Sequence, residues 1–476
     1  MLPAFTIRGN PATPIAKPFT ALTCILVAMA CPPVPAAAGE NWPQWRGPNL
    51  NGTAQATNLP VEWSETRNVR WKTDLPSWSA SSPIIWGDKV FVMSPAKGEV
   101  TEGVAPTPDS ANPPAERPRD FRGERRGGGM NPGGQALFLF CLNRENGGVR
   151  WMREVDQGNQ TYRKQNNTSP SPVTDGIHVW SYTGNGVLTC LDLEGREQWK
   201  RPIQKDYGRF GLNWGYGSSP LLVEDRLIIP VLHGNNTDDP SYVLAIDKAT
   251  GQTLWRTDRP TDAPRESPDA YVTPQLLRFP DHAEIVLNGG DLVTGHDLKS
   301  GREIWRADVL NPSKNGNYRI IPSCLVTDGL IIAPSRINPM VALKTGGRGD
   351  LSKTHVAWVS ENGPDVPTPV SDGTQLWMVT SDRSLFSCLD LKTGRPFYDR
   401  ERLPNATYSS SPVLAEGKIY LGNENSETIV LAATPEFRIL ATNKLEGFNT
   451  MSSPAVAGNQ IFIRTSAAIY CLSKAE

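Results

Sequence analysis

The amino-acid sequence predicts an all-β fold, an eight-bladed β-propeller of four-stranded antiparallel blades. Three observations carry this prediction. A Ser/Thr-Pro step followed by a β-hairpin pattern occurs eight times if two weaker versions are included, a pattern running from Asp to Trp follows most copies, and Gly and Pro each number 42. So much Gly and Pro excludes a fold of long helices, because both residues destabilise helix interiors.

The first repeated element is a Ser-Pro or Thr-Pro step, a short apolar run, a turn of Gly, Asp or Asn and a second apolar run. The stretch SSPLLVEDRLIIPV is a clear copy. β-Branched and apolar residues on both sides of such a turn predict a β-hairpin. The eight copies lie at 81–94, 169–182, 218–231, 272–287, 321–333, 368–380, 410–422 and 452–464.

The second element runs from Asp to Trp, as in LTCLDLEGREQW at residues 188–199. It predicts a third strand, a turn around Gly and a fourth strand. Further copies lie at 139–151, 244–255, 294–305 and 387–398, and YCLS at 470–473 begins another. Units of four strands, roughly 50 residues apart, indicate propeller blades, each of which buries its faces against its neighbours.

The position two residues before the Asp carries a small residue in every copy. The copies have Cys141, Cys190, Ala245, Gly295 and Cys388, and Cys471 is the expected sixth. A catalytic or metal-binding thiol could not become Ala or Gly, so we interpret these cysteines as small buried strand residues. An odd number of cysteines beyond the predicted leader also argues against a disulfide framework.

Tryptophan recurs at the end of the second element. We expect these indoles to be structural and to pack flat between blades, where each buries a large apolar area. They are Trp71, Trp151, Trp199, Trp255, Trp305 and Trp358. The alternative, stacking on nucleic-acid bases, does not suit a chain of net charge -1 with balanced charges around these residues.

Residues 1–38 are interpreted as a signal peptide. The apolar run at 19–30 is too short to span a bilayer, and AAA at 36–38 fits a cleavage site. A short membrane anchor or an unstructured tail is the alternative, and a lipid anchor on Cys31 is not expected because Leu is missing three residues before it. The mature chain is therefore expected in the periplasm or cell envelope, without a transmembrane helix.

Residues 39–69 are expected to form a lead-in segment and residues 70–476 the propeller. The eighth blade lacks a fourth strand at the C-terminus, and RWKTDL at 70–75 is expected to supply it and close the ring. Residues 95–135 are rich in Pro, Gly and charge, which predicts a mobile insertion within blade 1. Its arginine cluster could contact an anionic partner, and a solvated loop is the alternative.

The linkers before the Ser-Pro steps converge on the mouth of the central channel in a propeller. Here they are rich in Arg, Asn, Tyr and Trp, which are common at binding surfaces. The ligand-binding candidates are Arg163, Asn167, Arg209, Asn213, Trp214, Tyr216, Arg265, Tyr271, Tyr318, Arg319, Tyr408 and Asn449. Four linkers carry Arg, which favours an anionic ligand. The alternative is that the linkers only cap the funnel and satisfy one another.

No catalytic residue and no metal ligand is predicted. The five His show no metal-binding spacing, and the sequence offers no CxxC, nucleophile elbow or matched carboxylate pair. A hydrolase or lyase stays open as a third functional class, although no set of residues stands out to carry it.

The two elements together resemble the PQQ-like repeat, named for quinoprotein dehydrogenases. The resemblance covers roughly residues 63–473 and rests on the patterns SP-x(3)-DG and LxCLDxxTGxxxW. The opening NWPQWRGPNLNG at 41–52 is similar to the start of many exported bacterial propellers of this family. Within the family, eight blades without further domains look most similar to the BamB-type scaffolds of outer-membrane protein assembly.

The resemblance implies two functions. In the first, the chain is a non-catalytic monomer that binds an envelope protein or a small anionic ligand at its funnel and requires no cofactor. In the second, it is a PQQ-dependent dehydrogenase that oxidises an alcohol or sugar with PQQ and calcium in the channel. Such dehydrogenases typically carry an adjacent Cys pair, which this sequence lacks, so we favour the first.

Overall fold

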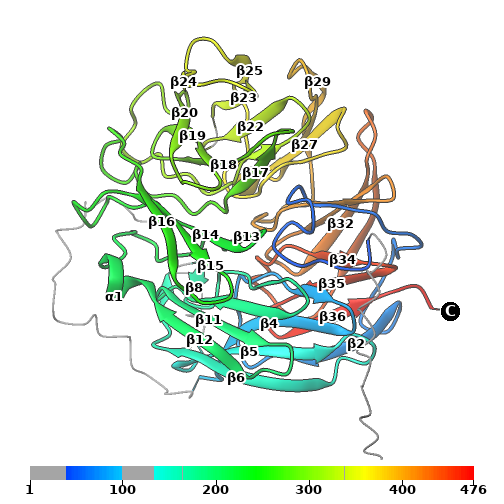
Figure 1. The fold of residues 1–476 in the computed structure, drawn as a ribbon. Coiled ribbons are helices and arrows are strands. Elements are labelled where there is room, and N and C mark those ends of the chain that lie inside the picture. The colour runs from blue at the N-terminus through cyan, green and yellow to red at the C-terminus, as the bar shows by residue number, and fades with distance from the viewer. Residues whose placement is uncertain (1–38, 99–132, 163, 337, 476) are drawn as a thin grey trace, which may run out of the picture. The chain divides into compact units, whose positions relative to one another are not determined.

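The computed structural model describes residues 39–98, 133–162, 164–336 and 338–475. The predicted signal peptide, most of the predicted insertion at 95–135 and the candidate Arg163 lie outside the described residues. Within them, eight four-stranded antiparallel blades surround a common axis, which confirms the predicted all-β propeller (Figure 1).

The first four blades each run from an inner to an outer strand in chain order. Blade 1 comprises β3 (Ile84–Trp86), β4 (Lys89–Pro95), β5 (Ala136–Asn143) and β6 (Val149–Gln157). Blade 2 comprises β9 (Val173–Thr174), β10 (His178–Tyr182), β11 (Val187–Asp192) and β12 (Glu197–Pro202). Blade 3 comprises β13 (Leu221–Val223), β14 (Arg226–Val231), β15 (Tyr242–Asp247) and β16 (Thr253–Asp258). Blade 4 comprises β17 (Gln275–Arg278), β18 (Ala283–Gly289), β19 (Leu292–Asp297) and β20 (Glu303–Asp308).

The next three blades repeat this order, and the eighth borrows its outer strand. Blade 5 comprises β21 (Leu325–Val326), β22 (Leu330–Pro334), β23 (Met340–Lys344) and β25 (Val356–Ser360). Blade 6 comprises β26 (Val370–Ser371), β27 (Gln375–Thr380), β28 (Leu385–Asp390) and β29 (Pro396–Arg402). Blade 7 comprises β30 (Val413–Ala415), β31 (Lys418–Gly422), β32 (Glu427–Ala432) and β33 (Ile439–Lys444). Blade 8 comprises β34 (Ala455–Ala457), β35 (Gln460–Arg464), β36 (Ala468–Leu472) and β2 (Val69–Asp74).

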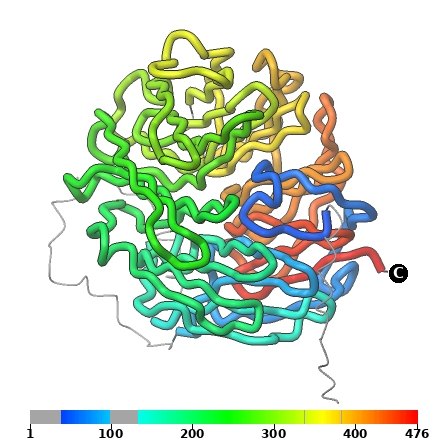
Figure 2. The backbone as a smooth tube through the Cα atoms, in the orientation of Figure 1, coloured from blue at the N-terminus to red at the C-terminus, as the bar shows by residue number. Residues whose placement is uncertain are grey.

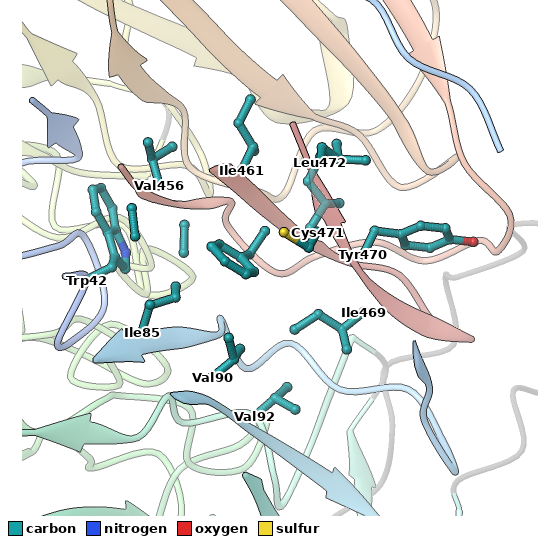
Figure 3. Close-up of a cluster of buried hydrophobic side chains, with 14 of the residues drawn as sticks. Trp42, Ile85, Val90, Val92, Val456, Ile461, Ile469, Tyr470, Cys471 and Leu472 are labelled. Atoms are coloured by element: carbon teal, nitrogen blue, oxygen red, sulfur yellow. The ribbon is translucent and has the colours of Figure 1, made fainter. Parts of the chain in front are cut away.

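Strand β2 closes the ring, as the sequence predicts. It pairs antiparallel with β36, and Trp71 lies opposite Cys471. The seam between blades 8 and 1 holds a large apolar cluster that includes Ile85, Val90 and Ile461 (Figure 3). Burial of this cluster stabilises the closure, because the inner faces of both blades are removed from water.

The remaining elements are short. β1 (Thr53–Ala54) adds in parallel to the inner strand of blade 7, and β24 (Gly349–Asp350) adds in parallel to the outer strand of blade 4. β7 (Thr161–Tyr162) and β8 (Gln165–Asn166) form a separate hairpin. The helices are α1 (Ile203–Tyr207) and the 3-10 helix η1 (Ser381–Arg383). Among the described residues, no helix has the length and apolar character needed to cross a membrane.

The aromatic ring at the end of each second element faces a small residue on the neighbouring strand. The cross-strand pairs are Cys141 with Trp151, Cys190 with Trp199, Ala245 with Trp255, Gly295 with Trp305, Ala342 with Trp358 and Cys388 with Tyr398. The described cysteines are all free and buried. The small side chains leave room for the indole on the same face of the sheet.

Four tryptophans make the same contact with the following blade, which we call the seam clamp. The indole lies over the turn between the third and fourth strands of that blade, and its N–H donates to a carbonyl in the turn. The bonds run from Trp71 to Arg144 (2.8 Å), Trp151 to Leu193 (2.9 Å), Trp255 to Leu298 (3.1 Å) and Trp358 to Leu391 (3.0 Å). The turn needs Gly there: a Cβ on Gly195 would lie 2.8 Å from the Trp151 ring.

Two tryptophans depart from the clamp. Trp199 lies over Gly251, but Trp180 already donates to the available carbonyl of Lys248 (3.0 Å), and the Trp199 N–H has no partner. Trp305 donates instead to the buried carboxylate of Glu284 in its own blade (2.7 Å).

The seam between blades 4 and 5 is joined by an added strand. The connection between β23 and β25 of blade 5 is longer than the corresponding connection in the other blades, and it places β24 against the outer strand of blade 4.

The lead-in segment seals one end of the channel. Its contacts with inner strands are Trp42 with Ile85 of blade 1, Pro43 with Thr174 of blade 2, Gln44 with Leu222 of blade 3, Arg46 with Pro369 of blade 6 and Gly52 with Leu414 of blade 7. Figure 2 shows this segment in blue beside the orange and red C-terminal blades. A stretch that the sequence leaves without structure is therefore a plug that ties five blades together.

The same segment supplies an indole to the seam between blades 7 and 8. Trp63 stacks on Tyr420, with ring centroids 6.4 Å apart, and its backbone N–H donates to Asn443 Oδ1 (2.8 Å). Asn443 Nδ2 in turn donates to the carbonyl of Val61 (2.9 Å). Blade 7 carries only Ala441 where other blades carry an aromatic ring, and Trp63 packs in the same apolar cluster as Ala441.

Candidate functional site: an axial chamber below a funnel mouth

A closed ring of eight hydroxyl groups surrounds the axis. The Ser or Thr that opens the inner strand region of each blade, followed by Pro in seven of the eight blades, accepts a hydrogen bond from the backbone N–H of the equivalent residue in the preceding blade. The donor–acceptor pairs are Ser82–Ser171 (3.0 Å), Ser171–Ser219 (2.9 Å), Ser219–Thr273 (3.2 Å), Thr273–Ser323 (2.9 Å), Ser323–Thr368 (2.9 Å), Thr368–Ser411 (2.9 Å), Ser411–Ser453 (3.1 Å) and Ser453–Ser82 (3.0 Å). Every member is thus both a donor and an acceptor.

The ring explains the Ser-Pro step. An inner strand has no neighbour on its channel side, so an N–H there would face the channel unpaired, and Pro removes it. Blade 5 has Cys324 in place of Pro, and the N–H of Cys324 donates to Asn288 Oδ1 (3.1 Å). Asn288 also donates to the carbonyls of Pro322 and Pro334, both at 2.9 Å.

The ring encloses an axial chamber of about 120 Å³. Besides the eight hydroxyl residues, its lining takes one residue from each linker, two positions before the hydroxyl. These are Ala80, Ser169, Gly217, Tyr271, Ile321, Val366, Ser409 and Met451. The floor includes Trp45 of the lead-in segment, and Gln165 completes the lining.

Arg46 lies beside the chamber floor and is fully buried. Its guanidinium donates to the carbonyls of Pro412 (2.7 Å), Asn51 (2.8 Å) and Pro369. Its Nε has no partner, and burial lowers the pKa of Arg46 to about 9. The guanidinium carbon lies 5.9 Å from the centroid of the Trp45 ring, so this cation stands next to the chamber floor.

A strap made of the β7–β8 hairpin crosses the mouth of the chamber. Gln165 donates to the carbonyls of Trp214 and Gly215, which belong to the linker between blades 2 and 3. Lys164 forms an ion pair of 2.9 Å with Glu424 of blade 7. The strap therefore joins opposite parts of the mouth and separates the chamber from the funnel above it.

Three linkers meet at one carboxylate on the rim of the funnel, and we call this group the mouth cluster. Trp214 Nε1 donates to Glu266 Oε1 (2.6 Å), and Arg319 Nη1 lies 3.1 Å from the same oxygen. The Arg319 guanidinium also stacks on the Trp214 ring at 5.6 Å. Asn213 Nδ2 approaches the same oxygen at 3.4 Å. Three of the predicted candidates are thus brought together, around a Glu that the sequence analysis missed.

Asp269 holds the linkers below the mouth cluster. It is fully buried, and its two oxygens accept the backbone N–H groups of Asn213 (2.8 Å) and Asn235 (3.1 Å). Burial raises the pKa of Asp269 to about 6. A carboxyl titrating near neutrality is also what a general acid or base requires, but both oxygens are already engaged with the backbone.

Five other candidates lie at the mouth in different ways. Arg209 and Arg265 are exposed, Tyr271 lines the chamber, and the Tyr318 hydroxyl donates to Asn338. Asn449 is half-buried in the linker before blade 8, with a left-handed backbone at φ +56°. Tyr271 contacts the mouth cluster, because its hydroxyl accepts the Trp214 backbone N–H (3.2 Å).

Three candidates point into the protein instead. Tyr216 and Tyr408 are buried and donate to the carbonyls of Pro230 and Pro404, both at 2.8 Å. Asn167 is buried and donates to the carbonyl of Gly158 (2.8 Å) and to Asn185 Oδ1. Their polar groups are satisfied internally, so they stabilise the linkers and offer nothing to a ligand in this arrangement.

The described thiols are unsuited to chemistry. Burial raises the pKa of Cys141, Cys190, Cys388 and Cys471 to about 12, and it also raises the pKa of Cys324. The thiolate is the nucleophile and the metal ligand, so such thiols are inert at neutral pH. Within the described residues, no group of three or more His, Cys, Asp or Glu is placed to hold a metal ion.

The chamber does not fit PQQ with calcium. Calcium prefers carboxylate and carbonyl oxygens, and none of the described lining residues is Asp or Glu. A cavity of about 150 Å³ holds a single benzene ring. At about 120 Å³ the chamber is too small for a tricyclic quinone.

Comparison with protein families gives one match over much of the chain. The model of a family described as "Outer membrane protein assembly factor BamB" matches residues 141–399, more than half of the sequence. A curated protein named outer membrane protein assembly factor BamB, from Burkholderia pseudomallei (strain K96243), is 28% identical over 131 residues. That match covers 27% of this chain and 29% of the relative, so it spans less than a third of the relative's length.

Solved structures share the fold. BamB from Moraxella catarrhalis is 14% identical with a TM-score of 0.53, over 72% of this chain and 95% of the other. A europium-containing methanol dehydrogenase is 12% identical with a TM-score of 0.62, over 91% of both chains. At such identities the likeness concerns the fold alone, and a scaffold and an enzyme share it equally.

Proposed function

The chain belongs to the family of the outer membrane protein assembly factor BamB, and on that premise we propose that it is an exported, non-catalytic scaffold that binds an envelope protein at its funnel. The protein acts as a monomer in the periplasm or cell envelope and requires no cofactor. A small anionic ligand is the second candidate for binding at the mouth, because Arg209 and Arg265 are exposed in the mouth linkers.

The observation that carries the proposal is the mouth cluster. Trp214 is only half-buried, yet its N–H and its ring are fixed by Glu266 and Arg319. Trp and Arg dominate the energetics of protein interfaces, and a side chain that is already immobilised loses little entropy on binding. Asn213 is exposed beside Trp214 and offers hydrogen bonds to a partner's backbone.

The cluster also limits the charge preference predicted from the linker arginines. Arg319 is paired with Glu266 at 3.1 Å, so it is not free to receive a carboxylate. A partner with apolar and amide groups therefore suits this point of the rim better than a strongly acidic one. The exposed arginines on either side are left to contact acidic side chains at the periphery.

A photo-crosslinking amino acid tests the location. Placed at position 213, it should cross-link to a protein of the outer-membrane assembly machinery in intact cells. The matched control is position 254, which is 43% exposed on the outer strand of blade 3, the blade that follows this linker. Trp214→Ala combined with Arg319→Ala should abolish the cross-link at 213 without lowering the melting temperature much. Equal cross-linking at both positions would contradict a funnel interface.

A separate assay tests the dehydrogenase alternative. Purified protein given PQQ and calcium should show no dye-linked oxidation of alcohols or sugars. Turnover that is lost when Arg209, Trp214 and Arg319 are all replaced by Ala would make the funnel an active site and replace the proposal.

N-terminal sequencing of the mature protein tests export. The sequence read should start near Gly39, and an intact leader on folded cytoplasmic protein would contradict export.

A further inference from the structure

We propose that the axial chamber is a binding site for a compact inorganic anion, either a halide or a small oxyanion. The site lies below the strap and is formed by residues other than the mouth cluster. It is therefore independent of the partner-binding function. Three features of the chamber favour an anion: the donors in the ring, the charge beside the floor and the volume.

The ring presents hydrogen-bond donors to the axis. Each of the eight hydroxyl oxygens accepts one backbone N–H, and each of the eight residues is more than nine-tenths buried. Within the described residues, none of these hydroxyls donates to a protein acceptor. A hydroxyl that has accepted a bond still carries one hydrogen to donate. Eight O–H groups are thus left to converge on whatever occupies the chamber.

The charge beneath the floor is positive and lacks a counter-ion. Arg46 is bonded to carbonyl oxygens alone, and no described carboxylate lies within ion-pair distance of it. Its pKa of about 9 still leaves it cationic at neutral pH. A buried charge is costly unless something of opposite sign compensates it. An anion in the chamber, which Trp45 lines, would compensate this charge in a region of low dielectric.

The other classes of occupant fit less well. A cation would meet eight hydroxyl dipoles but no carboxylate, and it would be repelled by Arg46. An apolar guest would leave the hydroxyls unpaired. A volume of about 120 Å³ corresponds to about four waters at liquid density, which is room for one halide or small oxyanion with part of its hydration shell.

Anomalous diffraction on the full chain tests the proposal directly. Crystals soaked in sodium bromide or sodium selenate should show a peak on the axis, within hydrogen-bonding reach of the ring hydroxyls. Crystals soaked in rubidium acetate should show none there. A rubidium peak in the chamber would overturn the proposal, and so would water density with neither bromide nor selenate bound.

A solution measurement keeps the proposal testable without crystals. The melting temperature should rise with sodium bromide at constant ionic strength, with sodium gluconate as the balancing salt because gluconate is too large for the chamber. Ser411→Ala removes one donor and should weaken bromide binding about tenfold. Ser411→Thr is the matched control, since Thr273 and Thr368 already occupy the ring. An equal bromide response in wild type and Ser411→Ala would overturn the proposal.

Crossed variants separate this site from the mouth. Trp214→Ala should leave the bromide response unchanged, and Ser411→Ala should leave the cross-link at position 213 unchanged. Loss of bromide binding in Trp214→Ala would mean that the anion sits in the funnel and not in the chamber, which would overturn the assignment. A missing partner cross-link with an intact bromide response would count against the proposed function alone.

Discussion

The inner edge of the propeller repeats in all eight blades, whereas the outer part changes from seam to seam. At the axis, every blade contributes one hydroxyl to one closed ring. Farther out, four seams carry the Trp clamp, blades 4 and 5 are joined by the added strand β24, and Tyr398 of blade 6 packs edge-on to Phe437 of blade 7 at 5.6 Å.

The difference follows from how much the two regions depend on geometry. A hydrogen bond tolerates only a few tenths of an ångström, and in a closed ring one missing hydroxyl leaves a neighbour's buried N–H unpaired. The outer seams are stabilised by apolar area, which does not depend on direction, so different side chains of similar volume can supply it. The inner edge is therefore uniform and the outer seams are varied.

The largest effect is expected at the clamp that closes the ring. Trp71→Ala should lower the free energy of unfolding by about 3–5 kcal/mol, because it empties a buried site between blades 8 and 1. Trp71→Phe should lose clearly less, since it retains most of the ring area. Urea denaturation of both variants checks this. If Trp71→Ala lowered the free energy of unfolding less than the removal of a ring hydroxyl does, the expected order of the outer seam and the inner ring would be reversed.

A ring hydroxyl should come next. Ser82→Ala leaves the buried N–H of Ser453 without an acceptor, which should cost about 1–3 kcal/mol. Ser82→Thr retains the acceptor and should be nearly neutral, as Thr fills the ring at two other blades. The same denaturation assay measures both. Equal losses for Ala and Thr would show that shape and not hydrogen bonding sets the uniformity of the ring.

The small residue under an indole should matter less. Cys190→Ala is expected to cost about 1 kcal/mol or less, because Ala245 occupies the equivalent place in blade 3. Thermal unfolding in the presence of reductant is the appropriate measurement. A destabilisation as large as that of Trp71→Ala would contradict the interpretation of Cys190 as a small buried strand residue.

The smallest effect should be a pH dependence at the turn between β17 and β18 of blade 4. The hydrogen bond that His282 donates to the Asp281 carboxylate raises the pKa of His282, which also contacts Glu284. The stabilisation is complete below the ordinary pKa of His and is lost as pH rises through the raised value. The pair is partly exposed and screened, so the change should stay below about 1 kcal/mol. In His282→Gln, melting temperatures between pH 5.5 and 8.5 should lose this component.

The repeat elements could be predicted from sequence because each is local. The strands and the turn of Asp and Gly follow from patterns within about 15 residues, repeated many times. The pairing of β2 with β36 could be predicted because the last copy of the repeat lacks its fourth strand and RWKTDL carries Trp71 at the matching position. The Ser-Pro steps were visible too, but their linkage into a ring was not. Each bond of the ring joins residues about one repeat apart, and a single hydrogen bond leaves no periodic signal in the sequence.

The linkers show where composition misleads. Tyr216 and Tyr408 stand three residues before a ring hydroxyl, and that position is buried in seven of the eight blades. The next residue in each linker lines the chamber. This alternation resembles that of a strand, and aligning the linkers on the ring hydroxyl would have separated inward from outward residues. The number of Arg, Asn, Tyr and Trp residues in a linker does not distinguish inward from outward side chains.

The lead-in segment was missed for a different reason. Trp42, Trp45 and Arg46 belong to no repeat, and each contacts a different part of the channel. Trp42 pairs with Ile85, Trp45 lines the chamber, and Arg46 donates to three carbonyls. An Arg in a stretch of Pro, Gly and Asn is expected in solvent, and only the three-dimensional structure places it in the interior. Its burial was therefore beyond sequence patterns, although the anion site depends on it.

The closure of the ring has a consequence for how the chain folds. Val69 pairs with Leu472, so this contact cannot form until nearly the whole sequence is present. Pairing between such distant residues is slow, and until it occurs β36 presents an unpaired edge to other chains. The lead-in plug precedes β2 directly and binds blades from both halves of the ring. The speed with which the two ends meet therefore decides how long an aggregation-prone edge stays exposed during folding.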